Sequence, residues 1–258
     1  MTPLVIAHRG NSAAAPENTF ASFESALRVG ATLVECDVQM TRDGQLVVIH
    51  DPTLDRTSDR RGDVRTLSLA EVRQADVSYP QVFGSTFPRQ QVPTLGELLA
   101  FLKGRARLML EIKADSSLPD SDEFERRIAA EIVKSGVRFS SNMETDIALL
   151  SFSTAILERM AGILPDAPRG HLFYRDPAEV IFAAAARVRA SFVMPEKGHL
   201  SPALLKLARQ QNLRVATWVC DDPAEFQQLG TLDLLGIGTN RPAAMIELGR
   251  ASAMATQA

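Results

Sequence analysis

Short apolar runs alternate with amphipathic segments along most of this chain. The runs that fit buried strands lie at residues 4–10, 33–40, 107–114, 147–152, 170–174, 191–194, 214–220 and 232–238. The segments between them place apolar residues at three- and four-residue steps, as residues 19–29 do with Phe20, Phe23 and Leu27 on one face, which is the period of a helix. Short strands that alternate with helices predict a parallel sheet with helical cover.

The number of strand–helix units favours a closed barrel. About eight units in roughly 250 residues predict an α/β fold of the TIM (β/α)8 barrel type. A doubly wound open sheet is the alternative, but no glycine-rich phosphate-binding motif follows any of the expected strands. An additional strand is expected at 46–50, joined to 33–40 by a tight turn at Asp43-Gly44.

The sequence predicts where several helices begin. Ser68 with Glu71, and Thr94 with Glu97, have the spacing of a capping box. Three later helices are expected to begin at an N-cap residue followed by proline, at Asp176-Pro177, Ser201-Pro202 and Asp222-Pro223.

One region departs from this alternation. Residues 51–93 are polar, rich in turns and carry several arginines, so they are expected to form an insertion over one end of a single catalytic domain that spans residues 1–250. The arginines of the insertion are expected to form a solvated face, with a role in substrate recognition left open. Its aromatic residues are expected either to cover a site or to support a homodimer contact: Tyr79, Phe83 and Phe87. Residues 251–258 are expected to be a frayed tail.

Composition narrows the classes of partner. The net charge is -3 and the pI about 5.9, so no affinity for nucleic acid or acidic membranes is expected. Cys36 and Cys220 fit no metal or disulfide spacing and are expected to be reduced and buried. No secretory signal precedes the first strand and no apolar run is long enough to span a membrane, which predicts a cytoplasmic protein.

Candidate chemistry begins in the stretch 33–51. Glu35 and Asp37 are two positions apart on an apolar strand, so their side chains lie on one face. Two carboxylates on a buried face are tolerated when they are protonated, paired with cations or bound to a metal. His50, followed by Asp51, ends the next apolar run.

Other expected strand ends carry matching groups. The first strand ends in His8-Arg9, and Glu111 and Lys113 again share one face of a strand. Three carboxylates with no cysteine nearby suit a hard divalent cation, Mg²⁺ or Ca²⁺. Two cations beside that metal make a phosphate grip, and two histidines at separate strand ends suit opposite proton transfers. Together these residues describe the hydrolysis of a phosphate ester.

The same residues carry a resemblance. The ordered motifs are HRG, PENT, E-x-D, the His50-Asp51 pair with Leu54 and Arg56-Thr57, E-I-K, and later VPTLGELL and GIGTNRP. This order resembles the glycerophosphodiester phosphodiesterase family of the cytoplasmic bacterial type.

The resemblance implies a distorted TIM barrel with an inserted subdomain. It implies hydrolysis of glycerophosphodiesters, such as glycerophosphocholine or glycerophosphoethanolamine, to glycerol 3-phosphate and an alcohol. The implied roles are metal binding by Glu35, Asp37 and Glu111, acid–base catalysis by His8 and His50, and phosphate binding by Arg9 and Lys113. Which histidine is the acid, and whether the metal is Mg²⁺ or Ca²⁺, stays open.

The chain departs from the family pattern in two places. Asn240 stands where the family usually has aspartate, and the sequence TWVCDD shifts Trp218 relative to its polar neighbours. Asn240 is expected to change little if its position only caps the final helix. Otherwise both changes are expected to affect the fit around the glycerol or head group and not the metal and histidine core. Trp218 is expected to contact substrate or to pack in the barrel. Asn18 is expected to cap a helix, to reach the site, or both. His171 and His199 are expected to be structural or surface residues.

Two other functions remain open at this point. One is a phospholipase-type phosphodiesterase that acts on lipids, and the other is a non-catalytic barrel that binds a phosphate ligand. The absence of a signal peptide speaks against the first, and the full set of acids and histidines speaks against the second.

Overall fold

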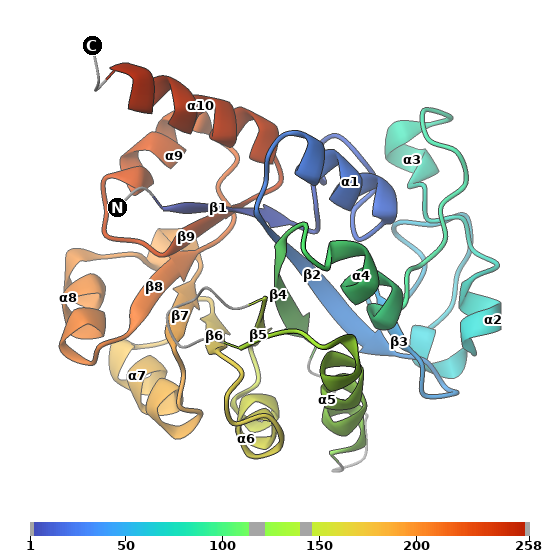
Figure 1. Ribbon diagram of the computed structural model, residues 1–258, viewed down its shortest axis with the longest axis horizontal. Helices are drawn as coiled ribbons and strands as arrows, with labels where there is room; N and C mark the ends of the chain where they lie inside the picture. Colours follow the sequence, from blue (N-terminus) through green and yellow to red (C-terminus); the bar gives the residue numbers. More distant parts are fainter. Residues whose placement is uncertain (1–2, 114–121, 140–145, 256–258) are drawn as a thin grey trace.

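A computed structural model describes residues 3–113, 122–139 and 146–255 and shows a sheet closed into a barrel (Figure 1). The barrel strands, in chain order, are β1 (Leu4–His8), β2 (Leu33–Met40), β4 (Arg107–Ile112), β5 (Ile147–Ser151), β6 (Arg169–Phe173), β7 (Phe192–Pro195), β8 (Arg214–Thr217) and β9 (Gly236–Thr239). Each strand pairs in parallel with the next, and β9 pairs with β1 to complete the ring. The predicted TIM barrel is confirmed, and the open sheet is excluded.

Helices cover the outside of this ring. They are α1 (Phe20–Arg28), α4 (Leu95–Leu102), α5 (Glu123–Ser135), α6 (Thr154–Ile163), α7 (Ala178–Arg187), α8 (Pro202–Gln210), α9 (Pro223–Gly230) and α10 (Pro242–Ala255). A short turn, η2 (Lys197–His199), precedes α8. The extra strand β3 (Leu46–Val48) pairs antiparallel with β2 outside the ring, as the turn at Asp43-Gly44 predicted.

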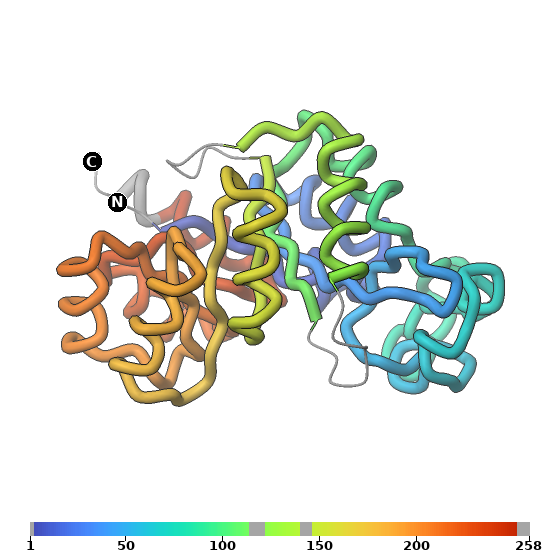
Figure 2. The backbone as a smooth tube through the Cα atoms, turned by 90° about the horizontal axis from the view of Figure 1, so that it is seen from below, coloured from blue at the N-terminus to red at the C-terminus, as the bar shows by residue number. Residues whose placement is uncertain are grey.

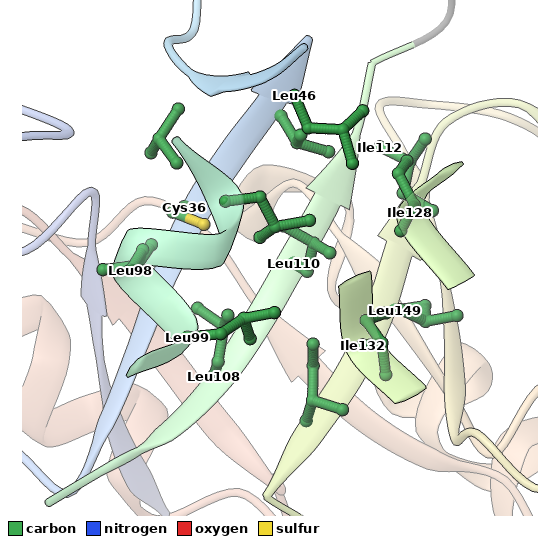
Figure 3. Packing of buried hydrophobic residues seen from close by; sticks show 14 of the residues in the cluster. Cys36, Leu46, Leu98, Leu99, Leu108, Leu110, Ile112, Ile128, Ile132 and Leu149 are labelled. Atoms are coloured by element: carbon green, nitrogen blue, oxygen red, sulfur yellow. The ribbon is translucent and has the colours of Figure 1, made fainter. Parts of the chain in front are cut away.

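The alternation of side chains along each strand separates two cores. The outward side chains of β2 and β4, such as Cys36 and Leu110, pack against Leu98 of α4 and Ile128 of α5 (Figure 3). The inward side chains fill the barrel with a second cluster, which includes Met109 and its neighbours on the other strands. Glu35 and Asp37 therefore face the barrel interior, while Cys36 points outward into the first cluster, and both cysteines are free and buried.

Residues 51–93 gather at one side of the barrel next to the β2–β3 hairpin (Figure 2). They contain η1 (Val64–Thr66), α2 (Leu69–Val72) and α3 (Pro80–Phe83). Leu54, Val64 and Val72 form a small core with Val47 of β3. The rings of Tyr79, Phe83 and Phe87 pack edge to face in sequence, with centroids 6.2 and 5.3 Å apart.

The observed N-caps of the helices can be compared with those that the sequence predicted. The capping boxes at Ser68 and Thr94 are confirmed, as are the N-caps Ser201 and Asp222. The prediction for α7 is wrong by one residue, since Pro177 has an extended ψ of 144° and is itself the N-cap, without a side-chain cap.

The end of the chain also differs from expectation. Helix α10 continues through Ala255, so residues 251–255 are helical where a tail was expected, and residues 256–258 lie outside the described part. Among the described residues, no helix combines the length and the apolar character that crossing a membrane requires.

The packing of α5 on the barrel generates a stability prediction. Ile128 is fully buried against β4, whereas Val133 on the same helix is 65% exposed. Ile128→Ala should lower the free energy of unfolding by about 2–5 kcal/mol, because it removes buried methyl groups and leaves a cavity. Val133→Ala should change it by less than about 0.5 kcal/mol. Urea titrations of the two variants measure both values, and equal losses would contradict the assigned packing.

Candidate active site

A cavity of about 470 Å³ opens at the C-terminal ends of the barrel strands. The first strands supply its charged half, which consists of His8, Arg9, Glu35, His50, Glu111 and Lys113. The later strands supply an apolar half, which consists of Leu150, Phe152, Leu172, Tyr174, Met194 and Trp218. The cavity thus brings together residues that lie far apart in the sequence.

Three carboxylates lie together at the charged half, where Glu35 and Glu111 line the cavity and Asp37 is fully buried beside them. In the register of β2 against β4, Asp37 lies beside Glu111, and Glu35 is two residues earlier on the same face. One oxygen of each carboxylate lies within 4.8 Å of the others, and all three residues are buried. The predicted grouping of Glu35, Asp37 and Glu111 therefore exists in the fold.

Two cations compensate part of this negative charge. Lys113 Nζ lies 2.7 Å from Asp37 Oδ1 and 2.5 Å from Glu111 Oε1. Arg9 Nε lies 3.2 Å from Asp37 Oδ2, and the Arg9 backbone N–H donates to Glu35 Oε2 at 3.0 Å. Asp37 thus has a cation on each oxygen, whereas no lysine or arginine side chain of the described residues contacts Glu35.

The pKa values follow this distribution. Burial, and then the charge of Asp37, raise the pKa of Glu35 well above its ordinary value and that of Glu111 to about 7. Burial acts in the same direction on Asp37, but Lys113 and Arg9 outweigh it and hold the pKa of Asp37 far below its usual range. The cluster consequently carries less than its full charge at neutral pH.

The donor set fits a hard divalent cation. Glu35 Oε1 is buried and accepts no hydrogen bond from the described residues, although a buried carboxylate oxygen is costly to leave without a partner. Glu35, Asp37 and Glu111 offer oxygen atoms only, which suits Mg²⁺ or Ca²⁺ better than Zn²⁺. The acidic cluster is therefore able to hold such an ion.

The loop after β1 places the side chains of Arg9 and Asn18 beside the carboxylate cluster. Arg9 has a positive φ of 57°, and its guanidinium also contacts Glu17, with Nη1 2.9 Å from Oε1. Asn18 donates from Nδ2 to Asp37 Oδ2 at 2.8 Å. The N-cap of α1 is Thr19, whose side chain accepts from Ser22 N, so Asn18 belongs to the site and not to the cap.

His8 is held by an amide. Its Nδ1 lies 2.7 Å from Asn240 Oδ1, and the Nδ2 of Asn240 donates to Asp221 Oδ2 at 2.7 Å. Because Asp221 accepts from the amide nitrogen, Asn240 Oδ1 is the atom that faces His8 and accepts from Nδ1–H. Nε2 of His8 then points toward Glu35, 3.9 Å away, and burial lowers the pKa of His8 to about 4.

His50 is held by a carboxylate instead. Its Nδ1 lies 2.7 Å from Asp51 Oδ1, and Asp51 also accepts from Arg56. Burial lowers the pKa of His50, while the hydrogen bond to Asp51 acts in the opposite direction. Both histidines are thus held through Nδ1, but by partners of different charge.

An aromatic group closes the other side of the cavity. Phe152 stacks on Tyr174 with ring centroids 5.0 Å apart, and Trp218 meets both rings edge to face. Trp218 Nε1 donates to Met194 O at 3.1 Å, which fixes the indole in the wall. Trp218 therefore both packs in the barrel and lines the cavity.

The sequence analysis missed part of this site. Asn240 was expected to cap the final helix or to affect the head-group fit, yet it contacts His8, because the β9–β1 pairing brings the chain ends together. Asp221 and Glu17 were not singled out, although Glu17 lies within the PENT motif. Tyr174 carried no signal beyond its position after a strand.

Two histidines lie outside the cavity lining. His171 is buried on the outer side of β6 with Nε2 3.2 Å from Thr154 Oγ1, and the ring of His199 packs on Phe173. These contacts are structural, as the sequence analysis expected.

Comparisons with known proteins agree with this geometry. The model of the glycerophosphoryl diester phosphodiesterase family matches residues 8–244. A glycerophosphodiester phosphodiesterase of Caldanaerobacter subterraneus is 31% identical over 97% of this chain and 99% of its own length. The crystal structure of a glycerophosphodiester phosphodiesterase from Agrobacterium tumefaciens has a TM-score of 0.78 at 30% identity and covers 96% of this chain and 100% of its own.

A third similar protein shares the fold at lower identity. It is an Oleispira antarctica phosphodiesterase, solved in complex with the product sn-glycerol-3-phosphate, with a TM-score of 0.83 and 24% identity. The alignment covers 96% of this chain and 97% of that one.

The raised pKa of Glu111 predicts how stability depends on pH. In chelator, the folded state binds more protons than the unfolded state between about pH 4.5 and the folded pKa of about 7, so this group makes the free energy of unfolding fall as the pH rises through that window. Glu111→Gln removes this titration. The stability of the wild type relative to Glu111→Gln should therefore fall by about 1–3 kcal/mol between pH 4.5 and 7.5.

Urea unfolding at several pH values measures this difference. Glu123→Gln is the control, since Glu123 is exposed on α5 and pairs with Arg127. This variant removes an exposed carboxylate and leaves the buried cluster intact. A constant difference between Glu111→Gln and the wild type would show that the pKa of Glu111 is not raised in the folded protein.

Proposed function

The chain belongs to the glycerophosphoryl diester phosphodiesterase family, and we propose that it hydrolyses glycerophosphodiesters such as glycerophosphocholine or glycerophosphoethanolamine to glycerol 3-phosphate and an alcohol. One observation carries this proposal. Two of three clustered, buried carboxylates line a single cavity at the C-terminal end of the barrel, together with two cations and two histidines. The product complex of the Oleispira protein supports a glycerol phosphate as the kind of molecule that such a cavity binds.

We infer that Glu35, Asp37 and Glu111 hold Mg²⁺ or Ca²⁺. When bound, the ion would polarise the phosphoryl oxygens of the substrate and orient it. Lys113 and Arg9 already contact Asp37 and face the cavity, so they are placed to bind the negatively charged phosphate beside the carboxylates.

We assign His8 as the general base. Its Nδ1–H is donated to a neutral amide oxygen of Asn240, so the ring gains no charged partner that would stabilise the imidazolium through this bond. Burial, and then the charge of Arg9, also favour the neutral ring. Nε2 of His8 is then free to accept a proton from the nucleophile, which is either water or a hydroxyl of the substrate.

We assign His50 as the general acid. The carboxylate of Asp51 accepts its Nδ1–H and stabilises the imidazolium form. Burial lowers the pKa of His50, and the negative charge of a bound phosphodiester opposes that effect. Nε2–H of His50 is then placed to give a proton to the departing alcohol oxygen.

The apolar half of the cavity is expected to receive carbon atoms of the substrate. Phe152, Tyr174 and Trp218 present ring surfaces, and the lining residues beside them bring no charge. The phosphate would therefore lie toward β1–β4, with one of its substituents against these rings.

The reaction itself is tested by product release. Purified protein should release glycerol 3-phosphate from glycerophosphocholine, lose this activity in chelator, and recover it with Mg²⁺ or Ca²⁺, as measured by a coupled glycerol 3-phosphate assay. Glu35→Gln should lower the activity by about 100-fold or more, because it removes a charged oxygen ligand. Folded protein that releases nothing with either ion would overturn the proposal, and lipid phosphodiesters would then be tested.

The two histidine roles are separated by the leaving group. A general acid matters most for a poor leaving group, so His50→Ala should lower kcat by about 10²–10⁴-fold on glycerophosphocholine but far less on glycerol 3-phosphate p-nitrophenyl ester. A general base acts on the nucleophile, so His8→Ala should lower kcat by a similar factor on both substrates. Release of glycerol 3-phosphate and of p-nitrophenol measures the four rates.

His199→Gln is the matched control for these variants, because His199 packs on Phe173 and does not line the cavity. It should leave both rates within about twofold. The opposite leaving-group pattern would exchange the two roles.

A further inference from the structure

We propose that Arg56 is a positioning residue that holds both His50 and Arg9 in their places in the cavity. The proposal rests on the proposed function for its activity measurements. Arg56 lies in the segment 51–93, whose arginines the sequence analysis expected to form a solvated face. The structure contradicts that expectation for this residue, since its side chain is 38% exposed and its guanidinium donates hydrogen bonds to two carboxylates.

The guanidinium of Arg56 bridges two carboxylates. Toward Asp51, Nε donates to Oδ2 at 2.7 Å and Nη2 to Oδ1 at 3.1 Å. Toward Glu17, Nη1 donates to Oε2 at 2.7 Å and Nη2 to Oε1 at 2.8 Å. Both contacts are bidentate, which fixes the plane of each carboxylate as well as its position.

Each of those carboxylates holds a residue of the site. Asp51 Oδ1 accepts from His50 Nδ1 at 2.7 Å, and Glu17 Oε1 accepts from Arg9 Nη1 at 2.9 Å. A continuous chain of polar contacts therefore runs from His50 through Asp51, Arg56 and Glu17 to Arg9. It joins the end of the β2–β3 hairpin to the loop after β1.

The backbone and the side chain of Arg56 are both restrained by neighbouring residues. Leu54 is buried in the small core of the 51–93 segment, and Ser58 donates from its backbone N and its Oγ to Leu54 O at 3.2 and 2.8 Å. The side chain of Tyr79 lies against the guanidinium, with 5.8 Å between the Cζ atom and the ring centroid. The backbone and the side chain of Arg56 are thus restricted before substrate binds.

Charge alone does not account for this arrangement. A lysine at position 56 would keep one positive charge but would not form two bidentate contacts at once. Without any cation at 56, Asp51 and Glu17 would face each other as like charges, and both would be free to turn. We therefore expect His50 and Arg9 to lose their orientation together.

The first test compares three variants with the wild type. Arg56→Gln and Arg56→Lys should each lower kcat on glycerophosphocholine by about 100-fold, because small displacements of catalytic groups cost rates of this order. Arg60→Gln is the matched control, since Arg60 is exposed in the same segment and its side chain bonds to Gln74. It should retain activity within about twofold. A folded Arg56→Gln protein with activity within threefold of the wild type would overturn the proposal.

A second test separates positioning from a merely structural role. Arg56→Ala leaves a partly open space between Asp51 and Glu17, which guanidinium ion fills with the same donors. Guanidinium at tens of millimolar should raise the kcat of Arg56→Ala by about tenfold and urea should not, while neither should raise that of the wild type. Absence of this difference in a variant with an unchanged melting temperature would contradict positioning.

A third measurement does not depend on the reaction. The proton on His50 Nδ1, hydrogen-bonded to Asp51, should give a downfield NMR signal that His50→Gln identifies. Arg56→Gln should shift or abolish this signal, and Arg60→Gln should not. If the wild type hydrolyses no glycerophosphodiester, the proposed function fails while this signal still tests the role of Arg56, and an unchanged signal in Arg56→Gln would overturn that role.

Discussion

The burial of three carboxylates on neighbouring strands of one barrel is the constraint on which the site depends. Glu35, Asp37 and Glu111 face the same interior, where water does not screen their repulsion. Lys113 and Arg9 pair with Asp37, whereas Glu35 keeps a buried oxygen that no described residue bonds. The described residues thus leave a buried carboxylate oxygen of Glu35 without a partner, and a bound divalent cation would satisfy that oxygen.

The surroundings of the two histidines show a second level of organisation. His8 is hydrogen-bonded to the amide of Asn240, which Asp221 orients. His50 is hydrogen-bonded to the carboxylate of Asp51, which Arg56 orients. A neutral hydrogen-bond acceptor favours an imidazole that accepts a proton, and a carboxylate acceptor favours an imidazolium that gives one. In the proposed mechanism, these different partners make His8 the base and His50 the acid.

The fold divides the cavity in a way that suits a phosphodiester. The charged groups come from β1 to β4 and the segment that follows β3, whereas the apolar wall comes from the ends of β5 to β8. A phosphate and its carbon substituents require these two environments side by side. The closed ring of strands supplies them because opposite strands of a barrel face one cavity.

The sequence by itself determined the barrel and the inner cluster, because both follow from short periods. Alternation along a strand places Glu35 with Asp37 and Glu111 with Lys113, and the count of strand–helix units predicts a closed sheet. Only the tertiary structure decided the contact of His8 with Asn240, 232 positions apart, which requires β9 to pair with β1. It also decided that Arg56 bonds inward, since the direction of a side chain in an irregular segment depends on which carboxylates the fold brings beside it.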